Sequence, residues 1–178
     1  MQMLPITDMR KWLSPHYALW LCLLGSASLL AGAFAFEYIG GLAPCKLCIW
    51  QRWPHAALVA LAAIGVMGQA VWLMLLACIG AALTSSAIGL YHVGVEQGWW
   101  SGPAGCSGQM GTNLDLSALT DTLLAMPVVR CDEIAWQFLG LSMAGWNMVI
   151  SAGIAGIAAT ALILPYRQKT ERDRIHDR

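Results

Sequence analysis

The chain has 178 residues, of which 58% are hydrophobic and only 11% charged, and its mean hydropathy is +0.60. Soluble domains carry about 25% charged residues, so this composition excludes a soluble globular protein and predicts a membrane protein with one compact unit, residues 1–178. The formal net charge is zero. That balance argues against a nucleic-acid partner, because such proteins present an excess of basic side chains.

Three stretches without Asp, Glu, Lys or Arg divide the chain. A spanning helix needs roughly 20 apolar residues. The stretches 12–36 and 134–166 each suit one span, while 53–95 suits two, with a break at the glycines of 65–69. The sequence therefore predicts an all-α membrane protein, a bundle of four transmembrane helices at about 17–38, 50–67, 71–93 and 145–165.

Basic residues are distributed unevenly between the two sides of this bundle. Seven of the ten lie in the tails 1–16 and 166–178, whereas the loops at about 39–49 and 94–144 and their borders hold the other three. An excess of Lys and Arg marks the cytoplasmic side. We therefore expect both termini in the cytoplasm and both loops on the outer face.

The start of the chain has a second interpretation. Arg10 and Lys11, an apolar run and the small residues at 31–33 resemble a signal peptide. The apolar run is about 20 residues long, however, whereas a signal peptide has about 7–15. We therefore favour a retained helix, and a mature N-terminus near residue 34 would contradict this topology.

The first loop ends in a pair of cysteines, Cys45 and Cys48, just before the second helix. Cys-x-x-Cys is a redox spacing, and it closes too small a loop to stabilise a fold. Cys48 would lie at a helix N-terminus, where the helix dipole favours negative charge. Arg52 follows one turn later, and Lys46 adds a second cation. These features favour a thiolate, although Arg52 alone is equally explained by contact with lipid headgroups.

The third helix carries small residues four apart, Ala77, Ala81, Ser85 and Gly89, which indicate a helix-packing seam. Cys22 and Cys78 fall within spans, where a thiol is hard to ionise, and we expect both to be inert. His92 closes the third helix at the outer face. Taken alone it is most simply a solvated interfacial residue.

The second loop is the one large segment outside the spans. It opens with many glycines and continues with apolar residues at helical spacing over 114–126. We expect a short helix there that lies flat on the membrane surface. Cys106 and Cys131 flank it.

Four cysteines outside the membrane allow three disulfide pairings, of which Cys45–Cys48 with Cys106–Cys131 is the most local. A Cys106–Cys131 bond would also serve as a structural staple. A zinc site with four cysteines typically has two Cys-x-x-Cys pairs. Zinc binding is disfavoured here, because 24 residues separate Cys106 from Cys131.

The pattern Pro-Cys-x-Leu-Cys-x-x-Gln-Arg at 44–52 resembles the signature of the disulfide bond formation protein B (DsbB) family. So do Cys-Asp-Glu-x-x-Trp-x-Phe-Leu-Gly-Leu-Ser-Met at 131–143, the four-helix layout and the cysteine pair in the second loop. The resemblance covers nearly the whole chain.

This resemblance implies a thiol:quinone oxidoreductase of the bacterial inner membrane that reoxidises a periplasmic DsbA-like oxidase and so supports periplasmic protein folding. Cys106 would form the mixed disulfide with that partner, and Cys131 would then attack Cys45. Cys48 would become the thiolate facing a bound quinone, ubiquinone or menaquinone, with Arg52 assisting. By the same resemblance, His92 and Trp136 would belong to the quinone surroundings.

Two other functions remain open from the residues. A membrane conduit could pass reducing equivalents outward, but its only candidate inner thiols, Cys22 and Cys78, are not paired by spacing. A non-enzymatic membrane protein could bind zinc or copper through Cys45 and Cys48.

Overall fold

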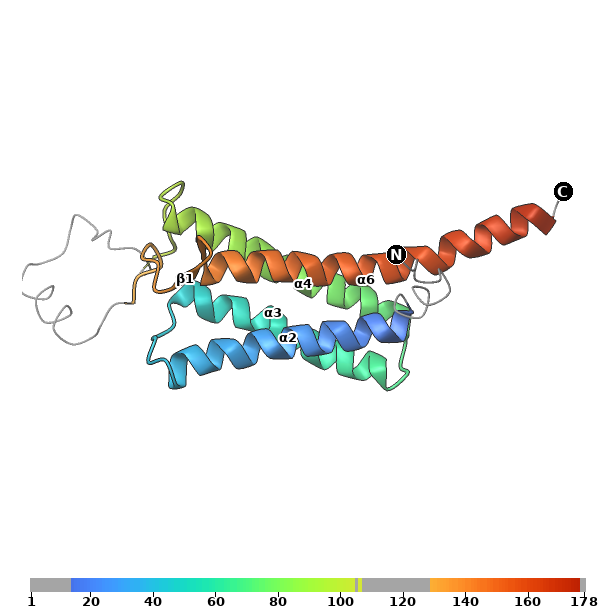
Figure 1. Ribbon diagram of the computed structural model, residues 1–178, viewed down its shortest axis with the longest axis horizontal. Coiled ribbons are helices and arrows are strands. Elements are labelled where there is room, and N and C mark those ends of the chain that lie inside the picture. Colours follow the sequence, from blue (N-terminus) through green and yellow to red (C-terminus); the bar gives the residue numbers. More distant parts are fainter. Residues whose placement is uncertain (1–13, 105, 107–128, 177–178) are drawn as a thin grey trace, which may run out of the picture.

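The computed structural model describes residues 14–104, 106 and 129–176, with residues 165–176 as backbone only. The predicted surface helix over 114–126 and most of the N-terminal tail lie outside the described residues. Within the described part, four helices lie side by side (Figure 1). They are α2 (Pro15–Tyr38), α3 (Lys46–Val66), α4 (Val71–Glu96) and α6 (Met143–His176), which confirms the four predicted helices.

Three of these helices are long and apolar enough to cross a membrane: α2, α4 and the Met143–Leu164 part of α6. In α3, Gln51, Arg52 and His55 interrupt the apolar sequence near its beginning. The length and composition of these three helices therefore make them candidate membrane spans. That α3 is a fourth span remains a prediction.

Helix α3 begins at Lys46, earlier than the predicted start near residue 50. Cys45 occupies the N-cap position with an extended backbone, and its sulfur accepts a hydrogen bond from the Cys48 amide at 3.2 Å. An N-cap acceptor satisfies an amide that has no partner within the helix. Because α3 starts earlier, Pro54 lies inside the helix rather than in its first turns. Proline has no N–H, so Pro54 cannot donate a hydrogen bond to the Trp50 carbonyl.

Helix α6 continues beyond Pro165, where the sequence predicted its end, and extends past the other helices (Figure 1). A proline removes a single backbone donor. The segment 166–176 is rich in Arg, Lys, Glu and Gln, which favour helix. The predicted cytoplasmic tail is therefore helical for most of its length.

A two-stranded hairpin within the second loop was not predicted. Strand β1 (Gln137–Phe138) pairs antiparallel with β2 (Leu141–Ser142). The connecting residues Leu139 and Gly140 both have positive φ, 50° and 79°, as a tight hairpin turn requires. The Trp146 indole donates to the Phe138 carbonyl at 3.0 Å, which fixes the hairpin against the start of α6.

Cys22 and Cys78 are fully buried in the apolar core between the four helices, in agreement with the inert role expected of them. A second, smaller core contains the other cysteines and lies where α3 begins and α4 ends. We call this end of the bundle the cysteine end.

The predicted small-residue seam of α4 is only partly correct. Ser85 and Gly89 are buried, whereas Ala77 and Ala81 are half-buried and the buried stripe passes instead through Cys78 and Ala82. Steps of four residues turn by about 40° more than one full revolution each, so a strict fourfold pattern drifts around the helix.

Gly89 provides a test of this packing. A Cβ at this position would lie 3.1 Å from the Ala144 carbonyl oxygen and the Met148 amide nitrogen of α6, whereas one at Gly80 of the same helix would meet nothing within 4 Å. We expect Gly89→Ala to lower the free energy of unfolding by about 1–3 kcal/mol. The matched control Gly80→Ala should raise it by up to about 1 kcal/mol. Denaturant unfolding in detergent measures both, and equal effects would contradict this packing.

Candidate active site

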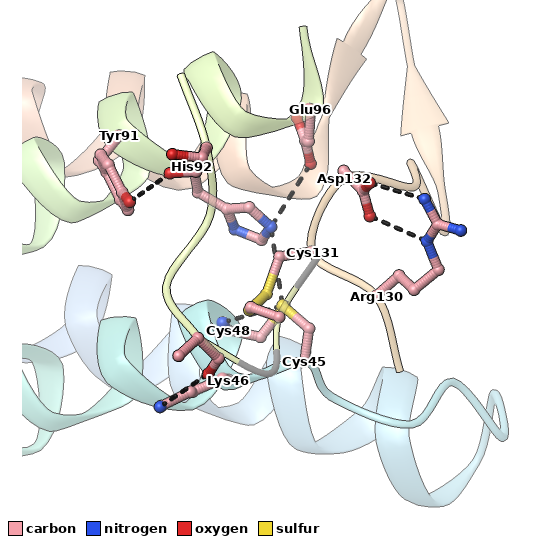
Figure 2. The surroundings of a disulfide bond; sticks show 12 residues. Cys45, Lys46, Cys48, Tyr91, His92, Glu96, Arg130, Cys131 and Asp132 are labelled. Atoms are coloured by element: carbon pink, nitrogen blue, oxygen red, sulfur yellow. Dashed lines mark hydrogen bonds and ion pairs between the residues drawn. A yellow bond between two sulfur atoms is a disulfide. The ribbon is translucent and has the colours of Figure 1, made fainter. Parts of the chain in front are cut away.

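Four cysteines from three segments meet at the cysteine end. Cys106 and Cys131 form a disulfide, which confirms that pairing, and both residues are fully buried. They belong to one apolar cluster with Cys45, against which Cys48 packs. Figure 2 shows Cys45 beside the disulfide, with Cys48 just beyond it. The two cysteine pairs are therefore neighbours without any rearrangement of the described chain.

Cys45 and Cys48 are free thiols in this structure, with their sulfurs 2.8 Å apart. The first turn of α3 brings them together, since residues three apart share one helix face. Cys45 is almost completely buried, while Cys48 is partly exposed. This geometry suits a pair that alternates between dithiol and disulfide.

His92 is held against the cysteine pair by a chain of polar contacts. Its Nδ1 accepts a hydrogen bond from the Gln51 amide at 2.9 Å. The Nε2 hydrogen is therefore directed to the Cys45 sulfur at 3.6 Å and to the Glu96 carboxylate at 3.8 Å. The sequence predicted His92 near the site only by family resemblance, and the fold brings it directly to Cys45 (Figure 2).

The negative charge of the reduced pair belongs to Cys45. The hydrogen bond from the Cys48 thiol lowers the pKa of Cys45 from its usual 9.0 to about 4, and the His92 imidazole and the Cys48 amide act in the same direction against the effect of burial. The hydrogen bond to Cys45 and burial raise the pKa of Cys48. The sequence predicted the thiolate on Cys48, whereas the structure favours Cys45. A proton shared by two adjacent sulfurs stays on the sulfur that receives fewer hydrogen bonds.

The two cations near the pair have different partners from those expected. Arg52 forms an ion pair with Glu37, donates to the Ala33 carbonyl at 3.5 Å and lies 4.9 Å from the Phe34 ring centre. Lys46 donates to the Ala104 carbonyl at 3.4 Å. Arg52 is therefore fixed beside α2, and Lys46 holds the second loop.

A cavity of about 220 Å³ lies between α2, α3 and α6 and reaches His92 on α4. Cys48, Arg52, His92 and Trp136, all predicted site residues, line it together. Most of the remaining lining is apolar. The other polar side chains on its wall are Ser28, Gln51, His55 and Asn147.

Sequence reasoning did not identify Gln51, His55, Glu96 or Asn147 as part of this site. The signal available for His55 was its position in a predicted span, because ionisable residues inside a membrane are rare and commonly functional. The absence of Asp, Glu, Lys and Arg, which marks the predicted spans, does not reveal a histidine inside them. Nothing in the sequence pairs Gln51 with His92, since they lie on different helices.

The donor atoms of Cys45, Cys48 and His92 lie within 4.8 Å of one another, so among the described residues this group could hold a metal ion. Two thiolates and an imidazole suit zinc or copper. The neighbouring Cys106 and Cys131 supply no thiolate while their disulfide is intact.

Comparisons with known proteins agree with this arrangement. The family model described as disulfide bond formation protein DsbB matches residues 15–161. A disulfide bond formation protein B of Hahella chejuensis is 31% identical over 168 residues, which cover 87% of this chain and 98% of that protein. The protein of the same name from Methylococcus capsulatus is 36% identical over 143 residues, covering 74% and 84%.

The family match includes α2, α3 and α4, the first part of α6 and all four cysteines of the cysteine end. The relatives are bacterial proteins with disulfide formation in their names. The chain therefore belongs to the DsbB family of disulfide-generating membrane oxidoreductases.

Proposed function

We propose that the protein reoxidises a DsbA-like dithiol oxidase in the periplasm and passes the electrons to a membrane quinone. The observation that carries this proposal is the contact between two cysteine pairs, one of which borders a cavity in the bundle. A single Cys-x-x-Cys could serve many redox reactions. Two adjacent pairs provide a relay from a protein partner to a small acceptor.

The partner's thiolate attacks Cys106, which forms a mixed disulfide and releases Cys131. Because Cys106 is fully buried, its sulfur must become exposed before the partner can reach it. The ion pair of Arg130 with Asp132, at 2.7 Å, orders the chain beside Cys131. Docking of the partner is therefore expected to expose Cys106.

Cys131 then attacks Cys45 of the Cys45–Cys48 disulfide, which it already adjoins. Once Cys45 is bonded to Cys131 it no longer holds the negative charge, and the leaving electron pair stays on Cys48 as thiolate. In the free dithiol the hydrogen bond to Cys45 and burial raise the pKa of Cys48, and the charge of Arg52 opposes them. Cys48 thus becomes the thiolate on the cavity wall at this stage, although Cys45 carries the charge in the free dithiol. The partner's second thiolate then displaces Cys106 and leaves the partner oxidised. Cys106 attacks Cys131, which re-forms the Cys106–Cys131 disulfide and releases Cys45, and Cys48 takes up a proton to give the reduced pair.

The residues on the cavity wall fit a quinone, which has a flat apolar ring and two carbonyl oxygens. Phe36 and Trp136, whose ring centres are 5.1 Å apart, offer aromatic surface. Arg52 offers hydrogen-bond donors to a carbonyl, and His92 lies on the same wall with its Nε2 hydrogen directed to Cys45. When bound, the quinone supplies an acceptor for two electrons and two protons, and the Cys45–Cys48 disulfide is restored.

The proposed orientation follows from this reaction. We place α3 across the membrane as the fourth span, with both termini in the cytoplasm and the cysteine end at the periplasmic face. The seven basic residues of the two tails support this. The exposed tryptophans Trp50, Trp99 and Trp100 at the cysteine end would form an interfacial belt.

Metal binding is the second candidate function, since Cys45, Cys48 and His92 provide three donors. The redox proposal is preferred because it also explains the adjacent disulfide. Stoichiometric zinc or copper held through Cys45 and Cys48 in the purified protein, with no quinone reduction, would favour metal binding instead.

Single cysteine substitutions separate the two halves of the relay. Cys106→Ser should abolish the mixed disulfide with the partner, because its attacked sulfur is gone. Cys48→Ser should keep that mixed disulfide and abolish quinone reduction, because no electron pair reaches the cavity. Gel analysis of the trapped complex and quinone absorbance measure the two steps. Cys78→Ala is the control and should preserve both, while quinone reduction by Cys48→Ser would contradict the proposal.

Arg52→His should lower quinone turnover by roughly 10–100-fold, since a charge-assisted hydrogen bond contributes about 1.5–3 kcal/mol. Thiol exchange with the partner should remain, because Arg52 is not in contact with the Cys106–Cys131 pair in the described structure. Arg174→His, in the part of α6 beyond Pro165, is the matched control. Equal quinone turnover in the two variants would remove Arg52 from the site.

The reduced protein should keep one thiolate well below neutral pH. Because the pKa of Cys45 is lowered to about 4, its charge is present at pH 7 and is lost only as the pH falls through that value. Titration of the thiolate ultraviolet absorbance measures this, and Cys45→Ser should remove the acidic step. Two thiols that both titrate near the usual value of 9.0 would contradict it.

A further inference from the structure

A cluster of polar side chains lies inside the bundle, away from the cysteines. His55 on α3 is 3% exposed and contacts all three of the other helices. Its Nε2 lies 2.8 Å from Asn147 Oδ1 and 3.0 Å from Ser85 Oγ, and its Nδ1 lies 2.7 Å from Ser26 Oγ. Ser151 adds a hydroxyl 3.3 Å from Nε2. Such a network inside an apolar bundle is costly unless every member is bonded.

This network accepts two protonation states of His55 without losing a hydrogen bond. In the neutral ring, Nε2 donates to Asn147 and Nδ1 accepts from the Ser26 hydroxyl. In the charged ring, Nδ1 donates to Ser26, whose hydroxyl can turn to the His55 carbonyl at 3.2 Å. A histidine with this freedom can gain and lose a proton within the membrane.

His55 and Asn147 also form part of the wall of the cavity that Cys48 and Arg52 line. They lie deeper in the bundle than Arg52. Arg52 contacts Ala33 of α2, and His55 contacts Ser26 of the same helix, seven residues away. At 1.5 Å per residue these two positions of α2 are about 10.5 Å apart along the helix axis.

A quinone has two opposite carbonyl oxygens. The cavity offers polar side chains for both, Arg52 near the cysteines and His55 with Asn147 deeper in the bundle.

We propose that Asn147 and His55 form the deep end of the quinone site, where Asn147 binds the carbonyl oxygen farther from the cysteines and His55 gives that oxygen its proton. The inference rests on the proposed function. Among the described contacts, the Asn147 amide nitrogen donates to Ser85 Oγ at 3.1 Å, which leaves its second hydrogen for a ligand. His55 is then a catalytic residue of the quinone step.

The protons and electrons balance. The Cys45 thiolate and the Cys48 thiol lose two electrons and one proton as their disulfide forms. Cys48 gives that proton to the oxygen near Arg52, and His55 gives its own proton to the deep oxygen. The proton that Cys45 gave up when it became a thiolate restores the charge of His55 afterwards, so that overall dithiol and quinone become disulfide and quinol.

No charged side chain of α2, α4 or α6 contacts His55 in the described structure, because these helices present Ser26, Ser85, Ser151 and Asn147 to it. The titratable groups that share its cavity are Cys48, Arg52 and His92. His55 is therefore the only imidazole at the deep end among the described residues.

The test compares binding with turnover for a short-chain benzoquinone in detergent. His55→Gln keeps a polar side chain but holds no exchangeable ring proton. We expect its quinone affinity, read from tryptophan fluorescence quenching, to stay within about threefold. Its kcat should fall by roughly 100-fold or more, the scale of general acid catalysis. Its solvent isotope effect on kcat should change as well.

Asn147→Leu should instead weaken quinone binding by about tenfold, the scale of one buried hydrogen bond. His16→Gln, at an exposed histidine at the start of α2, is the matched control and should change neither quantity. Partner thiol exchange should be normal in all three variants, since the cysteine end is unaltered.

The outcomes separate this inference from the function on which it rests. If the wild-type protein reduces no benzoquinone, the proposed function fails. If the wild type is active and His55→Gln has wild-type kcat, the role of His55 is overturned. Should His55→Gln not fold, Ser26→Ala decides: a lower kcat with unchanged quinone affinity supports the proton transfer, and an unchanged kcat and isotope effect reject it.

Discussion

The structure at the cysteine end depends on the hydrogen bonds that the Cys45 sulfur accepts. One comes from the Cys48 amide and starts α3, a second comes from the Cys48 thiol, and a third contact is the His92 imidazole. The same atom is thus the N-cap of a helix and the charged member of a dithiol. Because three donors converge on one sulfur, its charge is stable at neutral pH although the residue is almost completely buried.

The position of His92 is a consequence of helix packing. It reaches Cys45 because α4 lies along α3, and Gln51 holds the ring in the required tautomer. Close approach of α4 to α6 at Gly89 supports the same arrangement from the other side. Small residues in the bundle therefore allow close packing of α4, the helix that carries His92.

The cavity joins this redox pair to a polar cluster in an otherwise apolar bundle. One face of α3 presents Cys48, Arg52 and His55 to it in successive turns. Arg52 and His55 have hydrogen-bond partners on other helices, which is how a bundle tolerates polar groups without water. The proposed quinone site would use this combination of apolar wall and bonded polar ends.

The local pattern of the sequence determined that this is an all-α membrane protein, where its four helices lie and which residues form the Cys-x-x-Cys pair. Hydropathy and cysteine spacing are properties of neighbours along the chain. It could not determine which sulfur carries the charge. That depends on the contacts of the Cys45 sulfur with Cys48 and His92, whereas the sequence indicated the cations Arg52 and Lys46 by spacing alone. Only the tertiary structure turned Lys46 away to Ala104 and Arg52 towards Glu37. It also joined His55 to Asn147, residues 92 positions apart, because such contacts are fixed by helix packing and leave no periodic trace in the sequence.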